Sequence, residues 1–312
     1  MKARFMATLF TYPGQGTQKA GMLTELNAFP LGQQILQQAS DHLAQDILSL
    51  DNETALLNNR NTQVALTVCS YAYSQILRDL EIEPDYVLGL SIGAFPAAIS
   101  AGILTFEQGL DLVARRGELM ASAYPQGYGM AAVIGLSLPV LQTLLSQAQA
   151  QGHPVFIANI NTESQVVISG SVAALNTVCE LALAKQATSA KLLKVNVPSH
   201  CELLAPQAEI FNQAFDGIDL ARPKITYVSA NAARVLYPTD RIRDDLAHNM
   251  ARQVHWWETV AMLKERGVTL AIEMKPGSVL TNLCKASMPD TIAVAMASEN
   301  LNNLVALMRQ YG

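Results

Sequence analysis

The pentapeptide Gly89-Leu90-Ser91-Ile92-Gly93 follows a short apolar run that begins at Tyr86, and a segment of small residues comes after it. A serine at such a strand-to-helix turn has a strained backbone and an exposed hydroxyl, while flanking glycines avoid a collision of Cβ atoms. The helix N-terminus favours negative charge, so Ser91 could be a nucleophile and the Ile92 N–H an oxyanion donor. The same pentapeptide is also compatible with a packed turn.

A serine nucleophile needs a base, and the chain has five histidines. His200 follows Val197-Pro198-Ser199, at the predicted exit from a small subdomain, where it could overhang Ser91 and accept its proton. A hydrogen-bonded loop histidine is the alternative. Cys201 offers a second possible nucleophile, although a cysteine next to its base in sequence usually points away from it.

The other four histidines fit these roles less well. His42 and His153 lie in polar contexts and are expected at the surface. His248 and His255 could share a helix face, but with no carboxylate or cysteine expected beside them the sequence predicts no metal site.

Two further segments carry polar chemistry. Gln15 lies between two glycines directly after the first predicted strand, so its N–H is a second candidate oxyanion donor. Arg116, in Arg115-Arg116-Gly117, could hold a carboxylate with its planar guanidinium. The alternative for Arg116 is a surface ion pair with Asp111 or Glu118.

Strand-like and helical segments alternate along most of the chain, which predicts an α/β fold with a mostly parallel sheet and helices on both faces. The predicted strands are Thr8 to Thr11, Tyr86 to Leu90, Ile225 to Val228 and Val268 to Ile272. The predicted helices are Thr62 to Leu80, Thr105 to Met120, Glu202 to Phe215 and His255 to Arg266.

A segment of different composition interrupts this pattern, because Glu163 is the only charged residue between Leu119 and Cys179. Its predicted order is β-α-β-β-α-β, which is typical of a ferredoxin-like unit. The elements run 130–135, 138–150, 155–161, 165–169, 172–184 and 191–196. We therefore expect a small subdomain at 126–198, a large one at 1–125 and 199–312, and a ligand cleft between them.

Composition narrows the possible partners. The net charge of −5, without a basic stripe, argues against nucleic-acid binding. The uncharged stretch between Asp85 and Glu107 is better explained by a buried strand and helix than by a membrane span. Four widely spaced cysteines and no signal-peptide pattern predict a cytoplasmic protein with free thiols.

Together these segments resemble the malonyl-CoA:acyl carrier protein transacylases over about residues 8 to 290. The matching motifs are Phe10 to Gln18, Thr62-Gln63, Gly89 to Gly93, Arg116-Gly117, Asn161, Gln165 to Gly170, Val197 to His200 and Pro276 to Leu280. The resemblance implies an α/β-hydrolase-like large subdomain with a ferredoxin-like insertion. It also implies ping-pong transfer of a malonyl group from malonyl-CoA to an acyl carrier protein, with no cofactor.

The resemblance also assigns roles to residues. It implies Ser91 as nucleophile, His200 as base, and the N–H groups of Gln15 and Ile92 as oxyanion donors. Arg116 would bind the malonyl carboxylate. The other expected substrate-site residues are Gln63, Leu90, Asn161, Ser199 and Asn249, the last standing where the family has a glutamine whose backbone carbonyl orients the histidine.

The turn departs from the usual family pattern Gly-His-Ser-Leu-Gly-Glu, since Leu90 and Ala94 replace the histidine and the glutamate, and Lys275 replaces a glycine. A turn of this form is similar to the ε subunit of malonate decarboxylase, whose carrier bears a phosphoribosyl-dephospho-CoA arm. We therefore favour that subgroup, with other malonate decarboxylase subunits as further partners. The alternatives are a housekeeping enzyme of fatty acid synthesis, a serine hydrolase and a non-catalytic carrier-binding subunit.

Overall fold

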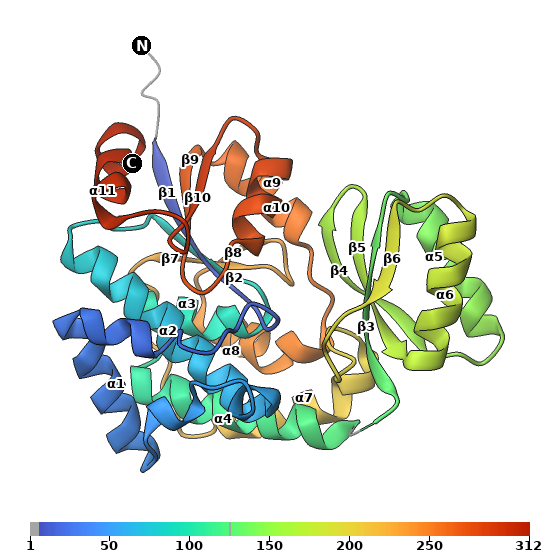
Figure 1. The fold of residues 1–312 in the computed structure, drawn as a ribbon, viewed down its shortest axis with the longest axis horizontal. Coiled ribbons are helices and arrows are strands. Elements are labelled where there is room, and N and C mark those ends of the chain that lie inside the picture. The colour runs from blue at the N-terminus through green and yellow to red at the C-terminus, as the bar shows by residue number, and fades with distance from the viewer. Residues whose placement is uncertain (1–5, 125) are drawn as a thin grey trace.

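The computed structural model describes residues 6–124 and 126–312, so residues 1–5 of the predicted large subdomain and Pro125 at its edge lie outside the described residues. The larger sheet has the strand order β10-β9-β1-β2-β7-β8 (Figure 1), and every pair is parallel except β7 with β8. The strands are β1 (Ala7–Tyr12), β2 (Tyr86–Gly89), β7 (Thr226–Ser229), β8 (Arg234–Leu236), β9 (Val268–Glu273) and β10 (Ile292–Ala295). The predicted mostly parallel sheet is therefore confirmed.

Helices cover both faces of this sheet, because its central strands are apolar on both sides. Leu9 and Leu88 pack against α9 (Trp256–Glu265) and α10 (Val279–Ser287). Phe10 and Val87, one residue along each strand, belong to a larger core on the opposite face. The helices of that core are α1 (Pro30–Leu43), α2 (Asn59–Asp79), α3 (Ala94–Ser100), α4 (Phe106–Ala123), α7 (Ala205–Asn212), α8 (Thr239–His248) and α11 (Leu301–Tyr311).

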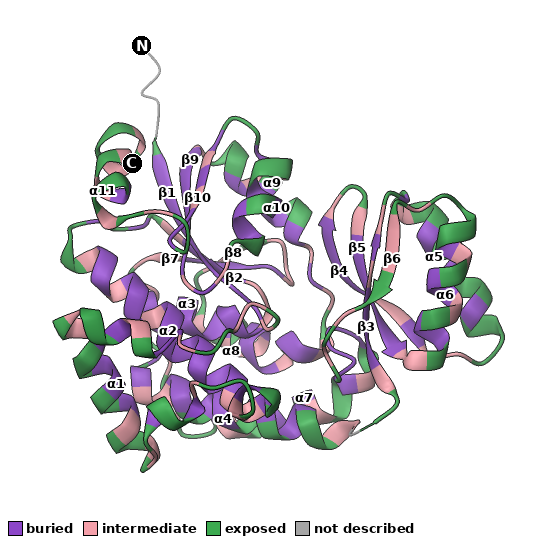
Figure 2. Cartoon of the chain, in the orientation of Figure 1, coloured by how far each residue is buried: buried purple, intermediate pink, exposed green. Residues whose placement is uncertain are grey.

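The uncharged stretch between Asp85 and Glu107 forms β2 and then α3. All seven residues of α3 are buried (Figure 2), so the apolar composition of this stretch reflects packing inside the protein. In the described part of the chain, no helix is long and apolar enough to cross a membrane.

The smaller sheet is antiparallel, with the order β4-β5-β3-β6. Its elements are β3 (Tyr128–Ile134), α5 (Leu138–Ala150), β4 (Val155–Thr162), β5 (Gln165–Ser171), α6 (Val172–Ala184) and β6 (Ser189–Leu192). Both helices lie on the face of the sheet that points away from the larger sheet (Figure 1). This is the predicted ferredoxin-like arrangement, and the division at 126 and 198 remains our proposal.

The last strand of the smaller sheet differs from the prediction. It spans Ser189–Leu192, whereas the sequence predicted Lys191 to Asn196. Leu193 and Val195, two alternating apolar residues of the predicted range, instead pack against Met130 and Val167 on the inner face. Burial against the cleft therefore produced the same period-two pattern as a strand would.

The two subdomains are also joined through main-chain hydrogen bonds. The Val254 N–H donates to the Ala158 carbonyl and the Ile160 N–H donates to the Val254 carbonyl, both at 2.8 Å. Strand β4 is therefore held directly against the segment that precedes α9, which fixes one wall of the cleft relative to the larger sheet.

Candidate active site

Ser91 lies in a strained turn at the end of β2. Its φ is 55°, in the left-handed region that few residues other than glycine adopt. A Cβ on Gly89 would overlap the backbone of Gly93, and a Cβ on Gly93 would overlap the carbonyl of Tyr12 in β1. Only glycine fits at either position. The turn therefore packs closely against β1 and against the helix that follows it, and this directs the Ser91 hydroxyl away from the sheet.

His200 lies directly beside Ser91. Its Nε2 is 2.8 Å from Ser91 Oγ, and its Nδ1 is 3.0 Å from the Asn249 carbonyl oxygen and 3.1 Å from the Arg252 carbonyl oxygen. Because carbonyl oxygens only accept hydrogen bonds, Nδ1 carries the proton and Nε2 is free to accept one from Ser91. The structure thus brings together the predicted nucleophile and the predicted base, 109 residues apart in the chain.

The environment keeps His200 neutral. Burial lowers the pKa of its imidazole to about 4, and the positive charge of Arg116 acts in the same direction. A neutral imidazole at physiological pH is the form that can take the serine proton. Within the described residues, carbonyls rather than a carboxylate face Nδ1, so the arrangement is a Ser-His dyad and not a triad.

Arg116, on α4, is almost completely buried at 1% exposure. Its Nη1 donates to Gln63 Oε1 at 2.9 Å, and its Nη2 donates to Asn249 Oδ1 at 3.0 Å and to Ser91 Oγ at 3.3 Å. The alternative of a surface pair with Asp111 or Glu118 is wrong, because Arg116 is buried. Asp111 instead lies beside His42, and Glu118 lies beside Arg60 and Arg115. Burial lowers the pKa of Arg116 to about 9, so it is still a cation at neutral pH.

Asn249 uses both its backbone and its side chain. The family resemblance implied that its carbonyl would orient the histidine, and the carbonyl does face His200. Its side-chain contact with Arg116 was not predicted. Gln63 likewise contacts Arg116, so these two expected substrate-site residues lie behind the cation.

A cavity of about 220 Å³ lies between the subdomains and reaches Ser91 and His200. The predicted residues Gln15, Leu90, Asn161 and Ser199 line it. Asn159, which the sequence analysis missed, lines it too, and the side-chain oxygens of Asn159 and Asn161 are buried without a hydrogen-bond partner. The period-two spacing from Asn161 along the same strand is a signal that could have identified Asn159.

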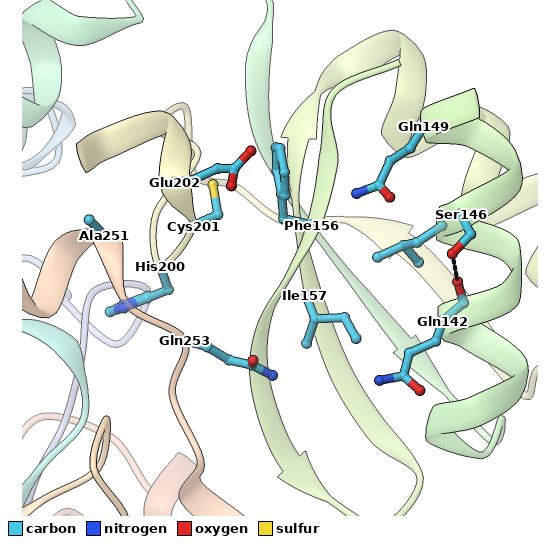
Figure 3. A pocket seen from close by; sticks show the side chains of 11 residues that line it. Gln142, Ser146, Gln149, Phe156, Ile157, His200, Cys201, Glu202, Ala251 and Gln253 are labelled. Atoms are coloured by element: carbon cyan, nitrogen blue, oxygen red, sulfur yellow. Dashed lines mark hydrogen bonds between the residues drawn. The ribbon is translucent and has the colours of Figure 1, made fainter. Parts of the chain in front are cut away.

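A second hollow of about 480 Å³ lies between α5 and β4 on one side and the segments around His200 and Ala251 on the other (Figure 3). Glutamine side chains and Ser146 supply much of its polar lining, and Ser91 does not line it. Cys201 lies in this hollow, its Sγ 3.3 Å from the Pro198 carbonyl, and burial raises the pKa of its thiol to about 11. Cys201 is therefore a poor nucleophile.

Three of the remaining histidines, His42, His248 and His255, lie near carboxylates. His42 lies 2.9 Å from Asp111. His248 ends α8, where Asp244 and Glu209 lie 3.0 and 3.3 Å from it, so the expectation that no carboxylate accompanies it is wrong. Asp244 is four residues earlier on the same helix, a spacing that the sequence analysis overlooked. Among the described residues, no three His, Cys, Asp or Glu side chains are grouped to hold a metal ion.

Comparison with known proteins identifies the family to which this chain belongs. Residues 9–309 match the acyl transferase domain family. A malonyl CoA-acyl carrier protein transacylase of Synechocystis is 34% identical over 91% of this chain and 95% of its own length, and one of Bacillus subtilis strain 168 is 33% identical over 92% and 95%. FabD from Acinetobacter baumannii superposes with a TM-score of 0.93 at 33% identity, covering 98% of this chain and 99% of that one.

A further solved structure is described as a type II PKS acyl-carrier protein in complex with its malonyl-transacylase. It has a TM-score of 0.91 at 32% identity, and covers 98% of this chain and all of that one. The fold and the family match thus define an acyltransferase. The chain belongs to the malonyl-CoA:acyl carrier protein transacylase family.

Proposed function

We propose that this protein transfers a malonyl group from malonyl-CoA to the thiol of an acyl carrier protein, through a malonyl ester on Ser91. Its family membership and the names of its relatives support this activity. The burial of Arg116 close to Ser91 is the observation that favours a malonyl group over an uncharged acyl group.

Arg116 is a buried cation without an acidic partner in the described part of the chain. Its hydrogen-bond partners are Gln63, Asn249 and Ser91, all of them neutral. A buried charge is costly unless it is paired, and a guanidinium binds a carboxylate through two parallel hydrogen bonds. An acyl group on Ser91 that ends in a free carboxylate would supply that partner, and malonyl, which the names of the relatives give, is a short acyl group with this property.

The proposed reaction uses Ser91 twice. His200 Nε2 takes the Ser91 proton as Oγ attacks the thioester carbon, and the N–H groups of Gln15 and Ile92 hold the oxyanion. When the C–S bond breaks, His200 returns the proton to the leaving CoA thiol. The carrier thiol then attacks the ester and loses its proton to His200, which protonates Ser91 as the ester bond breaks.

Intact-protein mass spectrometry after mixing with malonyl-CoA tests this proposal. A stable malonyl adduct on Ser91 that is discharged by a carrier thiol is the expected result. Release of free malonate without discharge to the thiol would indicate a serine hydrolase instead. Absence of any adduct would indicate a non-catalytic carrier-binding subunit.

Replacement of Arg116 by alanine should change the choice of acyl group more than it changes catalysis. Breaking a buried ion pair typically costs about 3–5 kcal/mol, so Arg116→Ala should slow malonyl transfer by roughly 10²- to 10³-fold. Transfer of an acetyl group, which has no carboxylate, should be unchanged or faster. The measurement is kcat/KM for malonyl-CoA and acetyl-CoA.

Arg115→Ala is the matched control, since Arg115 is the adjacent arginine on α4, with about half of its side chain exposed. It should leave both values of kcat/KM near those of the unmodified protein. An equal loss on both substrates in Arg116→Ala would show that Arg116 supports the fold and does not bind the carboxylate.

The identity of the carrier is a finer question. The malonyl CoA-acyl carrier protein transacylases named above favour the housekeeping enzyme of fatty acid synthesis over the ε subunit of malonate decarboxylase, which the turn around Leu90 suggested. The ε-subunit assignment, with its other subunits as partners, remains a prediction. Faster discharge of malonyl-Ser91 by a phosphoribosyl-dephospho-CoA carrier than by a phosphopantetheine carrier would support it.

The cytoplasmic location also remains a prediction. Cys69, Cys179, Cys201 and Cys284 are all free and buried, as expected for a protein that does not depend on disulfides.

A further inference from the structure

We propose that Asn231 is a positioning residue that holds the base and the cation of the active site through a single side-chain amide. The inference rests on the proposed function for the roles of His200 and Arg116. Asn231 lies in the turn between β7 and β8, outside every motif of the sequence analysis, and it does not line the cavity at Ser91.

One end of the Asn231 amide is directed toward the base. Its Nδ2 donates to the Arg252 carbonyl at 2.8 Å and to the Gln253 carbonyl at 3.0 Å. The Arg252 carbonyl is one of the two that accept from His200 Nδ1, at 3.1 Å. Asn231 therefore fixes a main-chain acceptor that sets the tautomer and the direction of the imidazole.

The other end is directed toward the cation. Asn231 Oδ1 accepts from Asn249 Nδ2 at 3.0 Å, and Asn249 Oδ1 accepts from Arg116 Nη2, also at 3.0 Å. The same Nη2 lies 3.3 Å from Ser91 Oγ. Two amides thus connect the turn after β7 with the guanidinium beside the nucleophile.

The chemistry of the ends fixes the direction of every hydrogen bond in this chain. A guanidinium only donates, so Asn249 must present its oxygen to Arg116 and its NH₂ group to Asn231. Main-chain carbonyls only accept, so Asn231 must present its NH₂ group to residues 252 and 253. Neither amide can be flipped without leaving a donor against a donor or an acceptor against an acceptor. Loss of Asn231 would remove both its hydrogen bonds to the carbonyls of residues 252 and 253, on the side of the base, and its hydrogen bond with Asn249, on the side of the cation.

Two substitutions separate the hydrogen bonds on the side of the base from the one on the side of the cation. Asn231→Ala removes both, whereas Asn231→Asp keeps an oxygen that accepts from Asn249 and places the other oxygen against two carbonyls. Arg234→Ala is the matched control, because Arg234 is an exposed residue of the same hairpin whose Nε donates to the Ala232 carbonyl. A thermal melt is recorded for each variant, and rates are compared among variants whose melting temperatures match that of the unmodified protein.

The first measurement is the rate at which a fluorophosphonate labels Ser91, which reports on the Ser91–His200 pair without any acyl-CoA. Both Asn231 variants should be labelled about tenfold more slowly than the unmodified protein, since small misplacements of catalytic groups are costly. The second measurement is kcat/KM for malonyl-CoA and for acetyl-CoA. The preference for malonyl should fall about tenfold in Asn231→Ala and be retained in Asn231→Asp.

Labelling of Asn231→Ala at the unmodified rate, or an equal slowing in Arg234→Ala, would overturn the proposal. If Asn231→Ala does not fold, Asn231→Asp decides: slower labelling with retained preference supports it, and unchanged labelling overturns it. If the unmodified protein does not accept malonyl-CoA, the proposed function fails, but the labelling rates still decide the role of Asn231.

Discussion

Ser91→Ala should abolish formation of the malonyl-enzyme and transfer of malonyl between thiols, while the protein still folds. The Ser91 hydroxyl lines a cavity and contributes little to the free energy of unfolding. Its hydrogen bonds are to His200 and Arg116, which both belong to the same site. Without Oγ there is no covalent intermediate, so a ping-pong reaction has no path. Mass spectrometry with malonyl-CoA and a thermal melt measure the two expectations.

Ser146→Ala provides the control, because Ser146 is a serine of the second hollow near His200 and its Oγ donates to the Gln142 carbonyl. This variant should acquire the adduct as the unmodified protein does. Transfer by Ser91→Ala at close to the unmodified rate would show that another group is the nucleophile.

His200→Ala should slow acylation by about 10²- to 10⁴-fold, the usual contribution of a positioned general base. The pH dependence of the unmodified protein provides an independent test. Because burial and Arg116 lower the pKa of His200 to about 4, the imidazole stays neutral above that pH. The rate of Ser91 acylation should therefore be flat from neutral pH to well below 6.5, and fall only as His200 becomes protonated near pH 4.

The acylation rate is best measured in single turnovers, so that release of CoA does not mask the chemical step. His153→Ala serves as the control, since His153 lies in the loop before β4 and away from the Ser91 cavity. If the acylation rate instead fell with a midpoint near pH 6.5, His200 would be accessible to water in solution. An unchanged rate in His200→Ala would remove it from the mechanism.

Local sequence was sufficient to predict many of the elements of this protein and to bring Ser91 and His200 forward as candidates. Period and turn residues predicted these strands, helices and the strained serine turn, because each is formed by residues close together in the chain. The parallel sheet and the ferredoxin-like order then followed from the sequence in which strands and helices alternate. Strand β6 is the exception. The alternation of Leu193 and Val195 reflects burial against the cleft, and the sequence does not say which surface buries an apolar residue.

Only the tertiary structure decided how the polar residues combine. From the sequence, Arg116 could equally have been a surface residue. The role proposed for it rests on its burial with Gln63 and Asn249, which come from α2 and from the turn after α8. Asn231 carried no signal at all, because its function lies in hydrogen bonds to carbonyls and an amide about 20 residues away. Such bonds depend on where loops from different strands meet, and no local pattern encodes that.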